Sequence, residues 1–395
     1  MVKNYLLTGI LVLVAGALLA QNYDESKVPA YTLPDPLRSL NNRTITKKHE
    51  WEKYRRQEIL SLFETNVYGT MPAGFDSIQY VLKDEDRQAM DGKAWMKKLQ
   101  IIVFRTGKSV AINLILFVPT KTGKPVPAFL LINNRGLDIM DATRTKKSEF
   151  WPAETVIESG YAIAAFQVND AAPDNKDTYM NGVLQLYPAL IVNNTGMKAI
   201  GSWAWAASRA MDYLVTDTMI DSRRVAVVGH SRGGKASLWA GAQDQRFAMV
   251  ISNCSGNTGA ALARRRFGET VKRINTSFPH WFADSYKKYN DNVDALPVDQ
   301  HMLIALIAPR PIYVTNASQD LWADPKGTFL SLKQAEIVFA LFNIRSSLPA
   351  EAPAINTPII NSQLGYHNRE GEHNMTLYDW RNFIHFANYH YRQKN

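Results

Sequence analysis

Cysteine is almost absent from this chain of 395 residues: Cys254 stands alone, so no disulfide can form within the molecule. A chain of this size can still bury a core large enough to hold its fold without such bonds. The HExxH motif of zinc hydrolases is also missing, and no other His/Glu spacing suggests a metal site. We therefore expect neither a metal nor an organic cofactor.

Long apolar runs are missing beyond the amino terminus, which excludes a membrane span in the body of the chain. Residues 1–20 differ, because Lys3 precedes the apolar stretch 5–14 and the small-residue end 15–20. This pattern is typical of a cleaved secretory signal peptide. A membrane anchor is the alternative, but the run is short for a span. We predict one catalytic domain at 21–395 in a periplasmic or secreted bacterial protein, since secreted eukaryotic chains more often carry disulfides.

Concentrated charge is scarce as well, although the formal net charge is +9. The basic residues are scattered, apart from 264–266 and 287–288, and no nucleic-acid-binding motif is visible. We therefore expect no nucleic-acid partner and no membrane partner. An anionic small group or a polysaccharide fits this charge better, and we expect a monomer.

Apolar runs bounded by turns alternate with segments of helical spacing along most of the chain. The strand-like runs are 95–104, 109–118, 128–133, 161–167, 224–228, 248–251 and 311–315. The helical segments are 51–68, 200–215, 235–243, 323–341 and a final helix from Leu377. This alternation predicts a mostly parallel sheet with helices on both faces, a three-layer α/β sandwich.

One motif indicates the chemistry. The apolar run Val225–Val228 leads into Gly229-His230-Ser231-Arg232-Gly233, and a helix-forming stretch follows. A Gly-x-Ser-x-Gly turn from strand into helix exposes the serine oxygen above the sheet edge, beside free backbone N–H groups. The glycines leave room for a strained serine backbone. The motif predicts the α/β-hydrolase fold, with Ser231 as nucleophile.

A serine nucleophile needs a histidine base, expected late in the chain after the last strand. Two histidines, His367 and His373, lie in the polar segment 364–376 just before the final helix. We favour His373, because Gly371 frees the backbone just before it, and His367 remains the alternative.

The histidine in turn needs a carboxylate to orient it. Asp320 follows the strand 311–315, at the edge of the sheet where the serine turn is also expected. Asp324 is the other candidate, but Pro325 follows it, which favours a helix cap. We predict that Asp320 is catalytic and that Asp324 caps the helix.

The motif Gly229-His230-Ser231-Arg232-Gly233-Gly234-Lys235 resembles the Gly-Cys-Ser-Arg-x-Gly-Lys motif of the glucuronoyl esterases, carbohydrate esterase family 15. The arginine and lysine make this match far more specific than the serine turn alone. The resemblance covers about the carboxyl-terminal half of the chain. Its further blocks are 255–262, 266–269, 278–282, 320–325, 365–367 and 371–373.

This resemblance implies hydrolysis of esters of 4-O-methyl-glucuronic acid, the bonds that join xylan side groups to lignin alcohols. It implies that Arg232 contributes to the oxyanion hole, beside the nucleophile Ser231 and the base His373. Three further residues are implied to hold the sugar: Lys235, Glu269 and Trp322.

The chain departs from the family at two positions. Cys254 stands where many members carry the catalytic glutamate, and Asp320 occupies the position that bacterial members often use instead. His230 replaces the cysteine of the motif, so the disulfide of fungal members is missing. Two other functions therefore stay open: a broader carboxylesterase, for instance on acetylated xylan, and an inactive polysaccharide-binding homologue.

Overall fold

The computed structural model describes residues 21–72 and 74–392. The predicted signal peptide, residues 1–20, lies outside these ranges, and its cleavage stays a prediction. None of the helices within the two ranges has the length and apolar character that crossing a bilayer requires.

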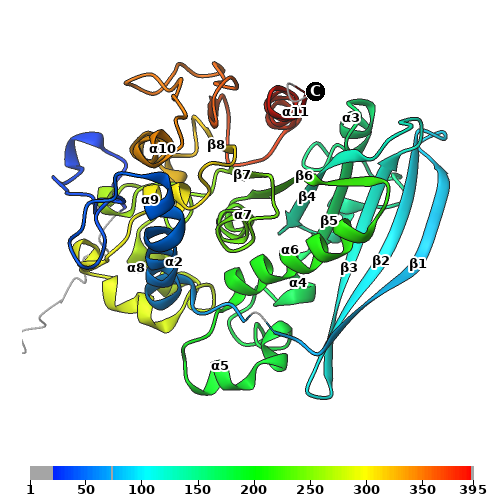
Figure 1. Cartoon of the computed structure of the whole chain (residues 1–395), viewed down its shortest axis with the longest axis horizontal. Coiled ribbons are helices and arrows are strands. Elements are labelled where there is room, and N and C mark those ends of the chain that lie inside the picture. The colour runs from blue at the N-terminus through cyan, green and yellow to red at the C-terminus, as the bar shows by residue number, and fades with distance from the viewer. Residues whose placement is uncertain (1–20, 73, 393–395) are drawn as a thin grey trace, which may run out of the picture.

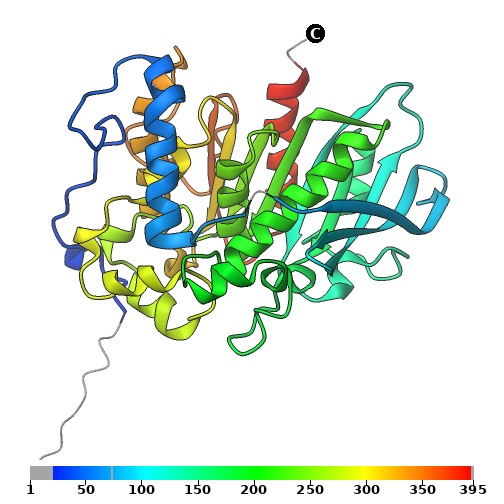
Figure 2. The same ribbon diagram turned by 60° about the horizontal axis from the view of Figure 1, so that its bottom comes forward.

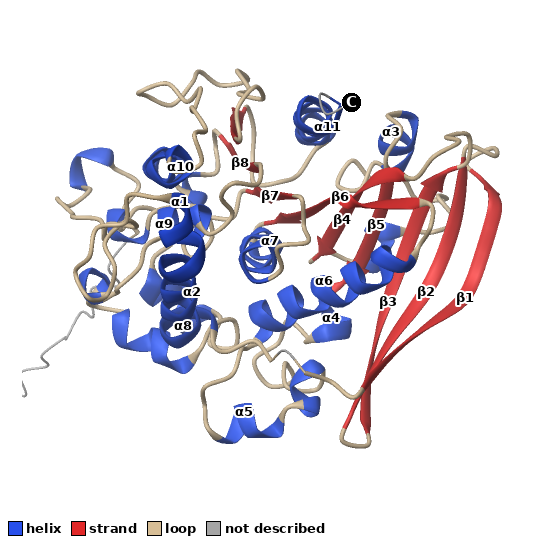
Figure 3. Cartoon of the chain, viewed as in Figure 1, coloured by secondary structure: helices blue, strands red, loops and turns tan. Residues whose placement is uncertain are grey.

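Nine strands of the described residues form one sheet in the order β1-β2-β3-β5-β4-β6-β7-β8-β9 (Figures 1 and 3). Strands β4 to β9 run parallel to one another. Strands β1, β2 and β3 extend this sheet beyond β5 in antiparallel pairs. The strands are β1 Ser77–Ala89, β2 Ala94–Arg105, β3 Lys108–Pro119, β4 Val126–Asn133, β5 Ala162–Gln167, β6 Ile220–His230, β7 Met249–Asn253, β8 Ile312–Ala317 and β9 Leu364–Arg369.

Helices cover both faces of this sheet. The α-helices are α1 Lys48–Glu50, α2 Arg56–Phe63, α3 Ala153–Glu158, α4 Val168–Ala171, α5 Pro188–Val192, α6 Ala199–Thr216, α7 Arg232–Gln243, α8 Val271–Ser277, α9 Gln300–Ala305, α10 Pro325–Ala340 and α11 Leu377–Arg392. Two π-helical stretches, Trp51–Arg55 and Glu64–Tyr68, extend α1 and α2 into the continuous helix predicted at 51–68. Figures 1 and 2 place this helix and the strands β1–β3 at opposite ends of the molecule.

Two apolar cores lie between the sheet and the helices on its two faces. The larger core joins the sheet to α2, α6, α7, α9 and α10, and the smaller one joins the other face to α3 and α11. Strands β5, β7 and β8 are buried along their whole length, as expected for strands covered on both faces. The predicted three-layer α/β-hydrolase architecture is therefore confirmed.

Every strand and helix expected from the sequence is present, but two strands were not anticipated. Strand β1 is largely exposed and carries many charged residues, so it lacks the apolar alternation of a half-buried strand. Strand β9 lies within the polar segment 364–376, where we predicted no strand, and it contains His367. Both strands lie at the edges of the sheet.

Candidate active site

Ser231 sits between the last residue of β6 and the first residue of α7, with φ 56° and ψ −126°. A side chain at Gly229 would lie 2.0 Å from the Gly233 carbonyl oxygen, and one at Gly233 would lie 3.0 Å from the Ile132 oxygen. The two glycines of the motif therefore allow the turn to close. The serine turn has the strained strand-to-helix geometry that the motif predicted, and the role of Ser231 as nucleophile stays a prediction.

His373 and Asp320 complete a triad with this serine. The Nε2 atom of His373 lies 2.9 Å from Ser231 Oγ, and its Nδ1 atom lies 2.5 Å from Asp320 Oδ2. The Asp320 side chain is buried, whereas the His373 side chain is 36% exposed. Three residues from distant parts of the chain thus meet with the geometry of a serine nucleophile, a base and an orienting acid.

Backbone bonds hold the two loops that carry His373 and Asp320. The loop after β8 donates from Ser318 N to Arg369 O at 2.8 Å and from Gln319 N to Gly371 O at 3.0 Å. Gly371 has φ 110°, a conformation that glycine adopts more readily than other residues. These bonds fix the imidazole beside the carboxylate before any ligand binds.

The alternative histidine does not face the serine. His367 is fully buried on β9, with Nε2 2.8 Å from Asp379 Oδ1 and Nδ1 3.0 Å from the Tyr313 hydroxyl. Arg369 Nε donates to the other oxygen of Asp379 at 2.9 Å. Burial raises the pKa of Asp379, but the bonds from His367 and Arg369 outweigh burial and lower it. His367 therefore helps to anchor the start of α11.

Asp324 caps a helix, as the sequence suggested. Its carboxylate accepts a hydrogen bond from Gly327 N at 2.8 Å, and Pro325 is the first residue of α10. Arg265 Nε lies 2.8 Å from the second oxygen of Asp324, so the cap is also a buried ion pair.

Arg232 is the first residue of α7, directly after the nucleophile. Its Nε lies 2.6 Å from Asp174 Oδ2, and its Nη2 donates to the Asn134 carbonyl oxygen at 3.1 Å. The Asp174 carboxylate also lies 2.9 Å from His280 Nε2 and accepts from Trp281 Nε1 at 2.7 Å. Burial works against the charge of Asp174, but these partners outweigh it and lower its pKa. No sequence signal points to Asp174, which lies in an irregular segment far from the motif.

Lys235 and Glu269 form a buried ion pair one helical turn beyond the serine. Lys235 Nζ lies 2.7 Å from Glu269 Oε2 and also donates to the carbonyl oxygens of Ser255 and Asn257. Burial lowers the pKa of Lys235 and raises that of Glu269, and the attraction between the two charges opposes both shifts. With Glu269 and two carbonyl oxygens as acceptors, all three N–H donors of the Lys235 ammonium are engaged.

Trp322 lies beside this pair. Its side chain opposes the rise that burial gives the Glu269 pKa, and its backbone oxygen accepts from Glu269 N at 2.9 Å. A side chain at Gly268 would lie 2.5 Å from this same oxygen, so glycine permits the close approach. Trp322 is only partly buried, unlike Glu269. The three residues assigned to sugar binding therefore form one connected group next to the loop of Asp320.

Three buried polar residues next to the triad, His230, Asn253 and Thr315, are joined by hydrogen bonds. His230 Nδ1 lies 2.6 Å from Asn253 Oδ1, and Asn253 Nδ2 donates to Thr315 Oγ1 at 2.6 Å. The His230 ring packs on the His373 ring, with 4.6 Å between centroids. Burial, and then the neighbouring His373 and Arg135 side chains, lower the pKa of His230 well below its usual value. His230 is therefore a neutral packing partner of the base.

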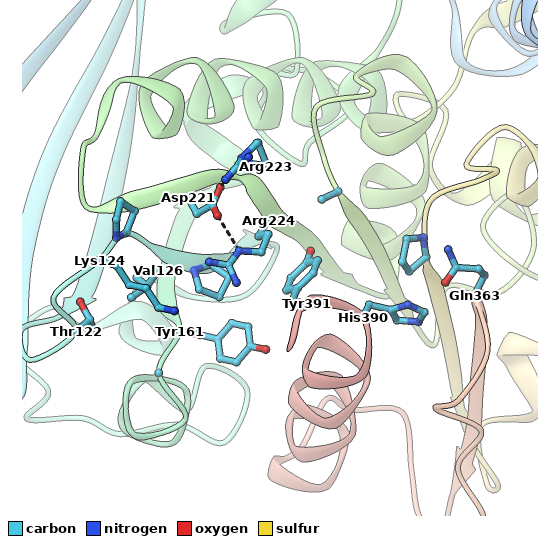
Figure 4. A pocket seen from close by; sticks show the side chains of 15 residues that line it. Thr122, Lys124, Val126, Tyr161, Asp221, Arg223, Arg224, Gln363, His390 and Tyr391 are labelled. Atoms are coloured by element: carbon cyan, nitrogen blue, oxygen red, sulfur yellow. Dashed lines mark hydrogen bonds and ion pairs between the residues drawn. The ribbon is translucent and has the colours of Figure 1, made fainter. Parts of the chain in front are cut away.

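A cavity of about 910 Å³ opens elsewhere, at the amino ends of the parallel strands (Figure 4). Its wall includes Lys124, Arg223 and Arg224, and Asp221 hydrogen-bonds to both arginines. Ligands of open α/β sheets bind at the carboxyl ends of the strands. The triad lies at that edge, because Ser231 directly follows β6 and Asp320 follows β8. The triad, not this cavity, is therefore the candidate active site.

A strained serine, an imidazole and a carboxylate at the carboxyl edge of this sheet form the arrangement that is typical of serine hydrolases with the α/β-hydrolase fold. A family model described as "Glucuronyl esterase, fungi" matches residues 101–343. The carbohydrate esterase MZ0003, from an unknown prokaryotic organism, is 40% identical over 93% of this chain and 92% of its own. The chain therefore belongs to the glucuronoyl esterase family, carbohydrate esterase family 15, and it is a carboxylic ester hydrolase.

Solved structures agree with this assignment. A promiscuous CE15 esterase from a marine bacterial metagenome is 40% identical, with a TM-score of 0.86 over 94% of this chain and 100% of the other. A glucuronoyl esterase from Solibacter usitatus is 37% identical, with a TM-score of 0.86 over 93% and 100% of the two chains. A curated relative from Schizophyllum commune, 26% identical over 79% of this chain and 74% of its own, is a 4-O-methyl-glucuronoyl methylesterase.

Proposed function

We propose that this protein hydrolyses esters of glucuronic acid or its 4-O-methyl derivative through a Ser231–His373–Asp320 triad. The observation that carries the proposal is the pair of short contacts from His373, 2.9 Å to Ser231 Oγ and 2.5 Å to Asp320 Oδ2. Family membership supports the substrate class, since several relatives are 4-O-methyl-glucuronoyl methylesterases.

The reaction proceeds in two acyl-transfer steps. His373 Nε2 takes the proton from Ser231 Oγ, which attacks the uronoyl carbonyl carbon. The imidazolium then gives this proton to the departing alcohol, leaving a uronoyl ester on Ser231. A water molecule, deprotonated by His373, attacks that ester, and its collapse releases glucuronate and restores the serine proton. Asp320 holds the imidazole in the productive tautomer throughout.

The oxyanion of each tetrahedral intermediate needs donors fixed in advance. Arg232 supplies its backbone N–H at the start of α7 and its guanidinium beside the nucleophile. The Asp174 carboxylate and the Asn134 carbonyl oxygen hold this guanidinium in the free enzyme. Its position therefore costs no reorganisation when negative charge develops.

The sugar lies against the group formed by Lys235, Glu269 and Trp322. The partly exposed Trp322 indole offers an apolar face to the ring, and the Glu269 carboxylate accepts from a sugar hydroxyl. The Lys235 ammonium opposes the rise that burial gives the Glu269 pKa, and it reaches the sugar itself by exchanging one of its two carbonyl acceptors. The natural ester is then the link between a xylan side group and a lignin alcohol, met in the periplasm or outside the cell.

A broader carboxylesterase is the second candidate, because the relative at 40% identity and 0.86 TM-score is described as promiscuous. An inactive polysaccharide-binding protein is disfavoured by the connected triad, which binding alone does not need. Comparing benzyl glucuronate with p-nitrophenyl acetate separates the two enzymes. The glucuronoyl esterase prefers the first substrate, and the preference falls in Trp322→Ala but not in Tyr54→Ala, an exposed aromatic control. Equal use of both esters, unchanged by Trp322→Ala, favours the broader enzyme. No turnover of either ester, in wild type as in Ser231→Ala, rejects both.

A further inference from the structure

Cys254 brings a third metal-binding type of side chain to the acid and base of the triad. One ligand atom each of Cys254, Asp320 and His373 lies within 4.8 Å of the others. Cys254 follows β7 with φ 47° and is almost fully buried, and its Sγ lies 3.9 Å from the Asn374 carbonyl oxygen. The proposed reaction gives this thiol no role.

The donor set matches a particular class of cation. A thiolate, an imidazole nitrogen and a carboxylate oxygen are the usual protein ligands of zinc and of its softer relative cadmium. In a tetrahedral zinc site, bond lengths of about 2.0–2.3 Å put neighbouring ligand atoms roughly 3.3–3.8 Å apart. His373 Nδ1 and Asp320 Oδ2, now 2.5 Å apart, need to separate by about 1 Å, and the half-open imidazole faces solvent that can supply the fourth ligand.

We propose that Cys254, Asp320 and His373 form an inhibitory site for zinc-like divalent cations, built into the catalytic triad. The inference rests on the proposed triad. It differs from a cofactor site because the cation stops the reaction instead of assisting it.

Binding changes the tautomer of the base. The cation replaces the thiol proton of Cys254, which leaves to solvent, and the Nδ1 proton of His373, which is relocated to Nε2. One proton is released overall, and the imidazole stays neutral. Nε2–H then donates to Ser231 Oγ and can no longer accept the serine proton. Two negative ligands, Cys254 and Asp320, offset the two positive charges of the cation, so the site closes with no net charge.

The test uses cadmium, because a cadmium–thiolate bond has an ultraviolet charge-transfer band that is seen without any turnover. Cadmium is titrated into the wild type and into Ser231→Ala while the band is followed. Inhibition of p-nitrophenyl acetate hydrolysis is measured in parallel on the wild type. We expect the band in both proteins, with a midpoint in the wild type equal to that of the inhibition. Failure of the glucuronate substrate leaves this readout intact, so the two proposals are tested separately.

Cys254→Ala removes the soft ligand, and His385→Ala removes an exposed histidine on α11 as the matched control. We expect Cys254→Ala to lose the band and to raise the inhibiting cadmium concentration more than tenfold, since loss of even an outer-shell partner costs about 10–100-fold in affinity. His385→Ala behaves as the wild type. The proposal is overturned if Cys254→Ala is inhibited as strongly as the wild type, or if the wild type shows no thiolate band at inhibiting concentrations.

Discussion

Arg232 and Asp174 form an ion pair next to the nucleophile, with 2.6 Å between Nε and Oδ2. The guanidinium that is proposed to face the oxyanion is therefore held by the Asp174 carboxylate. Asp174 also contacts His280 and Trp281, so it is fixed more firmly than an exposed partner. If Arg232 binds the oxyanion as proposed, Asp174 is a positioning residue for the oxyanion hole.

Replacing Arg232 by alanine removes one oxyanion donor but keeps its backbone N–H. We expect kcat to fall by about 10²–10³, the usual cost of losing such a donor, with a smaller change in KM. Asp174→Asn keeps the shape but loosens the guanidinium, and we expect a fall of about tenfold. Arg223→Ala, in the distant cavity wall, serves as the arginine control. Equal kcat in all three variants contradicts the role of Arg232.

Asp320→Asn tests the acid. The amide cannot hold the Nδ1 proton of His373 as the carboxylate does, so we expect kcat to fall by about 10⁴ with the fold unchanged. Circular dichroism and thermal unfolding check the fold, and steady-state kinetics on a small ester measure the loss. A fall of less than tenfold assigns the acid to another carboxylate.

Cys254→Glu tests whether the neighbouring position can supply the acid. Its ligand atom lies within 4.8 Å of those of Asp320 and His373, so a glutamate there reaches the imidazole. We expect the double variant Asp320→Asn/Cys254→Glu to recover at least about tenfold of the lost kcat. Asp320→Asn/Cys254→Gln is the matched control, with an uncharged side chain of the same length. Recovery in the control as well as in the glutamate variant removes the electrostatic explanation.

The Lys235–Glu269 pair makes a prediction about stability. Removing one partner leaves a buried charge without its counter-charge, so Lys235→Met and Glu269→Gln each lower the free energy of unfolding by about 3–5 kcal/mol. The double variant is expected to lose less than the sum of the two. A double-mutant cycle by urea denaturation measures the coupling. Additive losses indicate that the two charges do not interact in solution.

The buried His230 makes a prediction about pH. Its lowered pKa means that the folded protein resists protonation, whereas the unfolded chain takes up the proton near pH 6.5. The unfolded state then binds more protons, so stability is lost as pH falls below about 6.5, by up to about 1.4 kcal/mol per pH unit for this group. We expect His230→Asn to flatten the fall in unfolding free energy between about pH 6.5 and 5, and His385→Asn to leave it unchanged. An unchanged slope in His230→Asn contradicts the assignment.

The sequence was sufficient for the central strands and for the serine turn, because both carry strong local signals. Buried parallel strands are continuous apolar runs, and the turn needs glycines on both sides of Ser231. His373 and Asp320 followed from chain order and from their places after predicted strands. The structure brings both to Ser231 and leaves His367 bound to Asp379.

The parts that could not be anticipated depend on contacts between distant segments. Strand β9 was not predicted because its residues are polar. Their burial becomes possible only through hydrogen bonds to distant residues, such as the bond between His367 and Asp379. Asp174 has no local motif, and only the folded chain brings it to Arg232. The engagement of Lys235 by two backbone carbonyls has no sequence signal either, since backbone atoms of any residue can accept.

The most direct test of the triad compares single variants with the triple variant. Ser231→Ala, His373→Ala and Asp320→Asn are each measured on benzyl glucuronate, alongside the protein that carries all three changes. A nucleophile and base that act as one unit lose nearly everything with either change, so we predict that Ser231→Ala and His373→Ala each reach the kcat of the triple variant, and that Asp320→Asn comes close to it. Losses that add up step by step, or substantial activity left without Ser231 or His373, would contradict the account.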